Sequence, residues 1–351
     1  MCTPGWAGRR LHPVSELLSR NGSRLDSGSD VCWINPPRGA PWQALGEIAP
    51  LRLFSQDFGA ASELKAAGAP VEFGDFPVIA PHLAPHAILT LPRAKAALDM
   101  MLHCLATQLP ASGRLWLAGE NRAGIKSAKS HLAAHFGRVE KIDSARHCVL
   151  FEASKTGELP EFNADDFRSE YQASAGELTL TLVSWPGVFA HGRLDPGTAL
   201  LLECLAGIEA PGKVLDFGTG CGVIAAFLGL KHPGLELVLS DNDALALRSA
   251  AATLALNGVN GKVVASHGFS SIEGRFDLLV SNPPFHQGHV TRTDLSMRLL
   301  ADAGNFLNPG GQLLLVVNRH LPYRRWLDDT FTDHRVLASD NRYQVLSTTM
   351  P

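Results

Sequence analysis

The chain has 351 residues, 45% of them hydrophobic and 19% charged, which is typical of a soluble globular protein with two domains. Its formal net charge of −3 excludes a protein that coats nucleic acid through a globally basic surface. No apolar run reaches the roughly 20 residues of a membrane span, and the opening MCTPGWAGRR lacks the apolar core of a signal peptide. We therefore expect a cytoplasmic protein with no membrane partner.

The first half of the chain alternates β-rich runs with helical patterns, in the segments VCWINPPRGAPWQAL, AILTLPRAKAALDMML and SGRLWLAGENRAG. Basic side chains then gather between residues 114 and 146, where seven Lys and Arg face three Asp and Glu. The seven are Arg114, Arg122, Lys126, Lys129, Arg138, Lys141 and Arg146. This stretch is either a solvated helix face or a contact for a polyanion.

A polar connector, Glu152–Glu170, follows and marks the best domain boundary, which we place between residues 155 and 156. The charge also divides here. Residues 1–160 carry 17 Lys and Arg against 14 Asp and Glu, a sum of +3, whereas residues 161–351 carry 14 against 20, a sum of −6. The two predicted domains are thus 1–155 and 156–351.

The second half shows the β–α alternation of a doubly wound, mostly parallel sheet. The predicted strands are Lys213–Gly218, Glu236–Asp241, the run KVVAS, Phe276–Asn282 and Gly311–Asn318, and HRVLAS and YQVLSTT form a terminal antiparallel hairpin. Helices are expected in GVIAAFLGLKH, in DALALRSAAATLALNG and around Leu295–Phe306.

The two halves repeat one plan. The offset between matching segments is 183 from Val31 to Val214, 191 from Thr90 to Ser281 and 198 from Leu115 to Leu313. A matched order with a slow drift indicates a duplication, although any two α/β halves can be aligned loosely in this way. The fold class we expect is α/β, with two tandem Rossmann-like domains.

The loop DFGTGCG, Asp216–Gly222, joins a strand to a helix and carries glycines at 218, 220 and 222. Glycines let the main chain approach a ligand closely, and the helix N-terminus offers free N–H groups. A dinucleotide fingerprint, GxGxxG, would need a glycine at position 223, which is Val223. The spacing instead resembles the acidic GxGxG loop of class I S-adenosylmethionine-dependent methyltransferases, whose acidic residue lies near the methionine end of the cofactor.

Three further residues at strand ends are candidates for the same cofactor. Asp241 can accept hydrogen bonds from both ribose hydroxyls. Asn242 can border the adenine or belong to the cap of the next helix. His267 stands where such enzymes often carry an Asp or Asn for the adenine amino group, and it is either that contact or a structural histidine.

The sequence SNPPF, Ser281–Phe285, discriminates best between enzyme classes, because amino-group methyltransferases carry (D/N/S)PP(Y/F/W) after the fourth strand. An exocyclic amine is a weak nucleophile, and two acceptors, the Asn282 side-chain oxygen and the Pro283 carbonyl, can hold its nitrogen in line with a methyl donor. Pro283 and Pro284 fix φ and supply no competing N–H, and Phe285 can stack on a planar substrate. The alternative is a stiff strand exit with a core phenylalanine.

Metal and thiol chemistry have weaker support. His82/His86 and His131/His135 have i,i+4 spacing, but Pro85 disfavours a helix in the first pair and the second lacks an HExxH glutamate. The six cysteines contain no CxxC pair, and Cys221 is interpreted as a packing residue. We therefore expect no metal.

With these motifs the sequence resembles the ribosomal RNA small subunit methyltransferase C family, bacterial enzymes that methylate N2 of a guanine in 16S rRNA. The resemblance is carried by PVSELLSR, GENRAGIKSA, KIDSARHC, PGVFAHGRLDPGTALLL and GRFDLLVSNPPFHQG. It implies two methyltransferase-like domains, of which the second binds S-adenosylmethionine and the first has lost that ability but supports folding and RNA recognition. It also implies a target in the assembled 30S subunit. We expect the protein to be a monomer, although no motif in the sequence gives the oligomeric state.

Carried over to this chain, the resemblance implies a catalytic group of Asn282, Pro283, Pro284 and Phe285. The implied cofactor residues are Asp195, Thr198, Asp216, Gly218, Gly220, Gly222, Asp241, Asn242 and His267. The alternatives are a related enzyme acting on 23S rRNA, N6-adenine or glutamine-N5 methylation, and a catalytically silent RNA-binding factor.

A second NPP tripeptide, Asn35–Pro37, follows the first strand of the first half, where a glycine loop would be expected. Prolines there would keep a cofactor from the main chain. The alignment places Leu91 of LTLPRA opposite Asn282. The first tripeptide is therefore interpreted as a coincidence, and SNPPF as the site of the chemistry.

Overall fold

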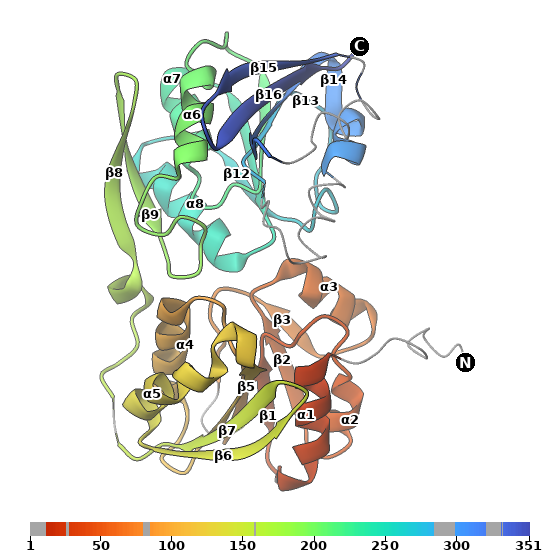
Figure 1. The fold of residues 1–351 in the computed structure, drawn as a ribbon, viewed down its shortest axis with the longest axis vertical. Helices are drawn as coiled ribbons and strands as arrows, with labels where there is room; N and C mark the ends of the chain where they lie inside the picture. The colour runs from red at the N-terminus through yellow and green to blue at the C-terminus, as the bar shows by residue number, and fades with distance from the viewer. Residues whose placement is uncertain are drawn as a thin grey trace, which may run out of the picture. The chain divides into compact units, whose positions relative to one another are not determined.

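The structure is a computed structural model that describes residues 12–25, 28–79, 85–157, 159–283, 299–320, 331 and 333–351. The chain divides into two compact units, Met1–Phe167 and Arg168–Pro351, and the division falls within the connector Glu152–Glu170. Each unit contains a seven-stranded sheet covered by helices (Figure 1). No helix in the described ranges is long and apolar enough to cross a membrane.

The sheet of the first unit has the strand order β3-β2-β1-β4-β5-β7-β6. The first five strands are parallel and the last two close the sheet as an antiparallel hairpin. Their bounds are β1 Val31–Ile34, β2 Leu51–Ser55, β3 Val71–Phe73, β4 His86–Thr90, β5 Arg114–Glu120, β6 Arg138–Ala145 and β7 Cys148–Ser154.

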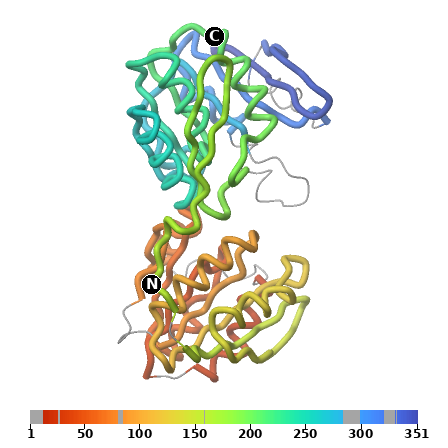
Figure 2. Tube along the Cα trace, turned by 90° about the vertical axis from the view of Figure 1, so that its left-hand side faces the viewer, coloured from red at the N-terminus to blue at the C-terminus, as the bar shows by residue number. Residues whose placement is uncertain are grey.

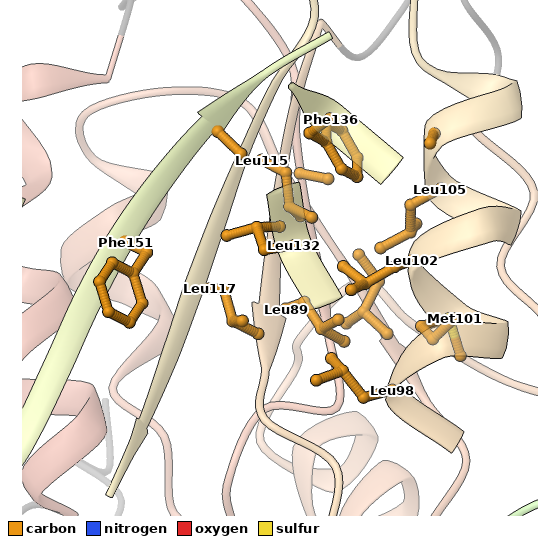
Figure 3. Packing of buried hydrophobic residues seen from close by; sticks show 14 of the residues in the cluster. Leu89, Leu98, Met101, Leu102, Leu105, Leu115, Leu117, Leu132, Phe136 and Phe151 are labelled. Carbon is orange, nitrogen blue, oxygen red and sulfur yellow. The ribbon is translucent and has the colours of Figure 1, made fainter. Parts of the chain in front are cut away.

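Helices cover both faces of this sheet. Their bounds are α1 Pro13–Asn21, α2 Trp42–Gly46, α3 Phe58–Ala66, α4 Lys95–Gln108 and α5 Ile125–Phe136, with 3₁₀ helices at Gly22–Arg24, Asn121–Ala123 and Ala164–Phe167. One core cluster joins α4 and α5 to one face, and the other joins α1, α2 and α3 to the opposite face. Figure 3 shows the first cluster, in which Leu102, Leu105 and Leu132 point from the helices toward the strands. Apolar residues on both faces explain why the central strands read as continuous hydrophobic runs.

The sheet of the second unit repeats this topology, with the order β12-β11-β10-β13-β14-β16-β15. Its strands are β10 Lys213–Phe217, β11 Glu236–Asp241, β12 Lys262–Ala265, β13 Phe276–Ser281, β14 Leu307–Asn318, β15 His334–Ser339 and β16 Tyr343–Thr349. The first five are parallel, and β15 and β16 form the predicted terminal hairpin. The expected fold class is confirmed.

The helices of the second unit are α6 Pro196–Leu205, α7 Val223–Lys231 and α8 Ala244–Leu256, followed by a 3₁₀ helix at Ala303–Phe306. The predicted helix around Leu295–Phe306 is helical from residue 299 onward, and residues 295–298 lie outside the described ranges. The hydrophobic patterns thus locate α7 and α8 well. The sheet and the residues after 298 enclose one core cluster, which includes Phe276, Leu299 and Leu315.

An antiparallel hairpin of β8, Ser169–Ala175, and β9, Leu178–Ser184, precedes α6 and was not predicted. It runs along the second unit as a long ribbon (Figure 2) and contacts α7 and α8. The free edge of β9 bonds to side chains of α8 instead of another strand. The Asn257 side chain bonds both main-chain groups of Thr181 (3.0 and 2.7 Å), and the hydroxyls of Thr253 and Ser249 accept from the next two edge N–H groups. Helical spacing of four residues places these three side chains on one face of α8.

The duplication is visible in the register of the strands. Trp33 pairs with Ile88 in the first unit as Asp216 pairs with Val280 in the second, so the offset at β4 and β13 is 192. The sequence alignment, which used 191 and placed Leu91 opposite Asn282, was wrong by one residue, and Thr90 stands at that position. The middle of each strand, Ala87–Leu89 and Leu278–Val280, is apolar throughout, and such runs lack the alternation that fixes register in sequence.

Candidate active site

Most of the sequence-predicted site residues lie at the carboxyl ends of β10, β11, β12 and β13 or in the loops that follow. In an open parallel sheet this edge, where the strand order reverses, is the usual ligand site. The reversal here lies between β10 and β13, since β11 and β12 lie on one side of β10 and β14 lies beyond β13. The glycine loop and Asn282 follow these two neighbouring strands.

The glycine loop has the backbone conformation that its sequence suggested. Gly218, Gly220 and Gly222 all have positive φ, at 69°, 57° and 79°. A Cβ on Gly218 or Gly220 would meet nothing within 4 Å, whereas one on Gly222 would lie 2.9 Å from the Ala250 Cα. The first two glycines therefore leave open space beside the main chain, and the third allows α7 to pack closely on α8.

Asp241 is fixed at the end of β11 by two main-chain hydrogen bonds. Its Oδ2 accepts from the Gly220 N–H (2.9 Å), and its Oδ1 accepts from the Asp243 N–H (3.0 Å). A carboxylate oxygen can accept more than one hydrogen bond, so this arrangement still allows ribose hydroxyls to donate to Asp241. Asn242 beside it is half-buried.

His267 follows β12, with a half-buried side chain. Its main-chain N–H donates to the Ser270 hydroxyl (3.1 Å), in a short turn after the strand. The structure thus places His267 at the same edge of the sheet as Asp241, and its contact with adenine stays a prediction.

Asp216 is fully buried at the end of β10. Its Oδ2 accepts from the Thr219 hydroxyl (2.6 Å) and the Ala225 N–H (3.3 Å), while Oδ1 has no hydrogen-bond partner in the described part of the chain. Burial raises the pKa of this carboxyl to about 7, against the opposing effect of the Thr219 hydrogen bond. Thr219 was not predicted as a site residue, although a threonine three residues after the acidic one is a visible signal.

Asn282, directly after β13, forms a hydrogen-bonded group with two residues at the start of α6. Its Nδ2 donates to the Asp195 Oδ2 (3.0 Å) and to the Thr198 Oγ1 (2.8 Å). A carboxylate can only accept, so the amide nitrogen must face Asp195 and the amide oxygen must face the other way. Pro283 is buried, and Pro284 and Phe285 lie outside the described residues.

Asp195 and Thr198 reach Asn282 because of how α6 begins. Asp195 is the N-cap of α6, with Pro196 in the first turn, and its Oδ2 accepts from the Thr198 N–H (2.9 Å). The Thr198 side chain, only 4% exposed, points to the same carboxylate. The family resemblance assigned both residues to the cofactor pocket, and the structure brings them into contact with Asn282.

These residues fit S-adenosylmethionine. The open space beside Gly218 and Gly220 lets a ligand lie against the main chain, and Asp241 offers acceptors for a ribose. The buried Asp216 carboxyl, with one oxygen that has no hydrogen-bond partner among the described residues, favours a cationic ligand nearby. Asp216, Gly218, Gly220 and Asp241 are the residues that would hold this cofactor.

Other chemistry has less support in the described ranges. No group of three or more His, Cys, Asp or Glu residues there is arranged to hold a metal ion. His131 instead bonds to the Asp99 carboxylate of α4 (Nδ1–Oδ1 2.7 Å). The Cys221 thiol is buried 3.9 Å from the Tyr171 hydroxyl, and burial raises the pKa of this thiol, which agrees with a packing role.

Two protein families match the two units. The Methyltransferase small domain N-terminal family matches residues 15–171, and the Methyltransferase small domain family matches residues 179–347. The ribosomal RNA small subunit methyltransferase C of Shewanella amazonensis is 37% identical over 346 residues, which is 95% of this chain and 98% of the relative. The chain belongs to the ribosomal RNA small subunit methyltransferase C family.

Other relatives agree with membership of the ribosomal RNA small subunit methyltransferase C family. The Cronobacter sakazakii protein of that name is 43% identical over 259 residues, 74% of each chain. Among solved structures, the T. thermophilus 16S rRNA N2 G1207 methyltransferase in complex with AdoMet and guanosine superimposes with a TM-score of 0.85. That similarity covers 99% of this chain and 94% of the other at 26% identity. The resemblance predicted from the sequence is confirmed.

Proposed function

We propose that this protein transfers a methyl group from S-adenosylmethionine to N2 of a guanine in 16S rRNA, within the assembled 30S subunit. The observation that carries the proposal is the orientation of Asn282, whose amide nitrogen is bound to Asp195 and Thr198 and whose oxygen is left to accept from an amine. The similarity to the T. thermophilus enzyme, which holds AdoMet and guanosine, supports both cofactor and base.

The chemistry follows from the weakness of an exocyclic amine as a nucleophile. Its lone pair is delocalised into the base, and acceptors on its N–H bonds favour a geometry in which the lone pair points at the methyl group. Asn282 Oδ1 and the Pro283 carbonyl would be those acceptors. S-adenosylmethionine would supply a methyl group on a positively charged sulfur. The N2 nitrogen would form its bond to this methyl as the sulfur–methyl bond breaks, with S-adenosylhomocysteine as the other product and one proton released to water.

We assign catalysis to residues 156–351 and support of RNA recognition and folding to residues 1–155. Part of the basic stretch is neutralised, because Arg122 pairs with Glu120, Arg138 with Glu140 and Arg146 with Glu16. Lys126 and Lys129 on α5 are exposed and make no ion pair with a described residue, so we propose them as phosphate contacts. We also propose that the protein is cytoplasmic and acts as a monomer.

The test is methylation of ribosomal particles that lack the modification. Purified 30S subunits, protein-free 16S rRNA and 50S subunits are incubated with S-adenosylmethionine and the protein, and the rRNA is digested and analysed by mass spectrometry. We expect one N2-methylguanine in the 30S sample. Methylation confined to 50S subunits would favour the 23S alternative, and methyladenine would favour the N6 alternative. No incorporation despite measured S-adenosylmethionine binding would favour a silent RNA-binding factor.

A further inference from the structure

We propose that Asp195 and Thr198 are positioning residues for Asn282, and that they make the site selective for a group that donates an N–H. This role differs from lining a cofactor pocket. The inference rests on the proposed function, because it concerns how the amine of the acceptor base is selected.

Both N–H bonds of the Asn282 side chain are used in hydrogen bonds within the protein. An amide NH₂ has two N–H bonds, and the two short contacts, to the Asp195 carboxylate and the Thr198 hydroxyl, use both. Rotating the amide by 180° would bring its oxygen against the Asp195 carboxylate, and two acceptors would then face each other with no proton between them. The amide is therefore held in one orientation.

In this orientation Asn282 presents its Oδ1 to a substrate. Asn282 Oδ1 can only accept, so an amine N–H is attracted while an unprotonated ring nitrogen or a carbonyl in the same place is repelled. On a guanine edge this distinguishes the N2 amine from O6. A charged acceptor on Nδ2 also polarises the amide and strengthens Oδ1 as an acceptor.

The first turn of α6, which holds the amide through Asp195 and Thr198, is itself held in place by its neighbours. Asp195 caps α6 through the Thr198 N–H, and α6 contacts β14 and β16. A Cβ on Gly197 would lie 3.0 Å from the Tyr343 ring, so the first turn of α6 sits directly on β16. The turn that carries Asp195 and Thr198 has little room to move.

The first unit supplies an independent comparison. The offset of 183 that relates β1 to β10 also relates α1 to α6, so His12 stands at the position of Asp195 and Ser15 at that of Thr198. Thr90, which has no amide, stands at the position of Asn282. There the Ser15 hydroxyl is buried without a partner in the described part of the chain. The first unit thus lacks both the amide and the carboxylate, and the Ser15 hydroxyl that remains has no amide to bind.

Thr198→Val is the sharpest variant, because it removes one hydroxyl and keeps the shape. We expect about a tenfold lower kcat on 30S subunits, with the dissociation constant for S-adenosylmethionine within threefold of wild type. Thr198→Ser keeps the hydroxyl and should restore most of the activity. Asp195→Asn keeps the helix cap and removes the charge, and we expect a loss of about 10- to 100-fold in kcat.

A double-mutant cycle separates positioning from other roles. Asn282→Ser leaves no amide to orient, so adding Thr198→Val to it should lower kcat by less than twofold. Additive losses would overturn the proposal. So would S-adenosylmethionine binding that weakens in proportion to kcat, because that result would return both residues to the cofactor pocket.

A second measurement does not depend on turnover. The side-chain NH₂ signals of Asn282, assigned by their loss in Asn282→Ser, should be resolved and slow to exchange in the ¹⁵N-asparagine-labelled full chain, and Thr198→Val should shift at least one of them. Unshifted signals would overturn the proposal even if the wild type methylated no rRNA. Shifted signals with an inactive wild type would leave the positioning intact and reject the proposed function alone.

Discussion

The two units share a strand order, yet they differ at four positions that belong to the site in the second unit. Asp216, Gly218, Asp241 and Asn282 correspond to Trp33, Asn35, Ser55 and Thr90. Some of the local bonding is preserved. Asn35 donates its N–H to the Phe54 carbonyl as Gly218 does to that of Ser240, and Ser55 bonds the N–H of the capping Asp57 as Asp241 bonds that of Asp243. The scaffold has therefore been kept while the ligand contacts have changed.

The first unit fills its own edge with side chains. Asn35 keeps a positive φ of 53° and exchanges two hydrogen bonds of 2.9 Å with Gln56. Trp33 is fully buried and donates to the Thr90 hydroxyl (3.1 Å). Polar groups that would otherwise face a ligand are thus satisfied internally, as buried polar groups generally are. The core therefore specifies this fold, whereas a few residues at one edge of the sheet specify the activity.

The largest effect is expected at Asn282, whose position in the first unit is occupied by Thr90. Asn282→Ala should lower kcat by about 10² to 10³, because it removes an acceptor aimed at the reacting nitrogen. The affinity for S-adenosylmethionine should stay within a few fold, because the side chain meets the substrate. Thr90→Ala is the matched control and should leave kcat unchanged. Strongly weakened cofactor binding in a calorimetric titration of Asn282→Ala would refute this assignment.

The second effect concerns Gly218→Asn, which tests whether a side chain at this position prevents the cofactor from reaching the glycine loop. Gly218→Asn introduces the residue found at position 35, which tolerates a positive φ, so the fold should survive with nearly the same Tm. Its side chain would enter the open space beside Gly218, and we expect S-adenosylmethionine affinity to fall by at least about tenfold. Binding at wild-type strength, measured by calorimetry, would show that the cofactor does not approach this part of the loop.

The sequence predicted much of this comparison, and the parts it missed have physical reasons. Glycines, prolines and strand-end carboxylates are local signals, so the loop 216–222 and the strand before Asn282 were located correctly. The contact between Asn282 and Asp195 joins residues 87 apart, and no local pattern encodes such a pairing. The β8–β9 hairpin was not predicted, although LTLTLVS alternates apolar and polar residues as a strand does. The register of β4 was wrong by one residue because its apolar middle, Ala87–Leu89, shows no such alternation.

A smaller effect is expected on the basic first unit. Replacing Lys126 and Lys129 with Glu should weaken binding to 30S subunits several-fold and reduce the slope of log K against log salt by about 1 to 2, the contribution of two phosphate contacts. Lys65→Glu with Lys262→Glu makes the same change in net charge at two other exposed lysines and serves as the control. An equal change in both double variants would assign the effect to overall charge and remove α5 from the interface.

The last effect concerns the pH dependence of stability, at the position where the second unit has Asp216 and the first has Trp33. Burial raises the pKa of Asp216 from 3.8 to about 7, so between these values the folded protein binds a proton more tightly than the unfolded chain does. Stability from this group is therefore complete below pH 4 and is lost as the pH rises to 7, by an amount on the order of 4 kcal/mol.

Asp216→Asn removes this titration. Between pH 5 and pH 8 the unfolding free energy of the wild type should therefore fall relative to that of the variant. Urea unfolding at the two pH values measures that difference, and Trp33→Phe in the first unit, which changes no titrating group, should show no such shift.

S-adenosylmethionine, as a cation, should favour the ionised carboxylate and bind the wild type more tightly at pH 8 than at pH 6. A wild-type affinity that does not change with pH would mean that Asp216 keeps its charge state on binding, and that its buried oxygen faces packing rather than the cofactor.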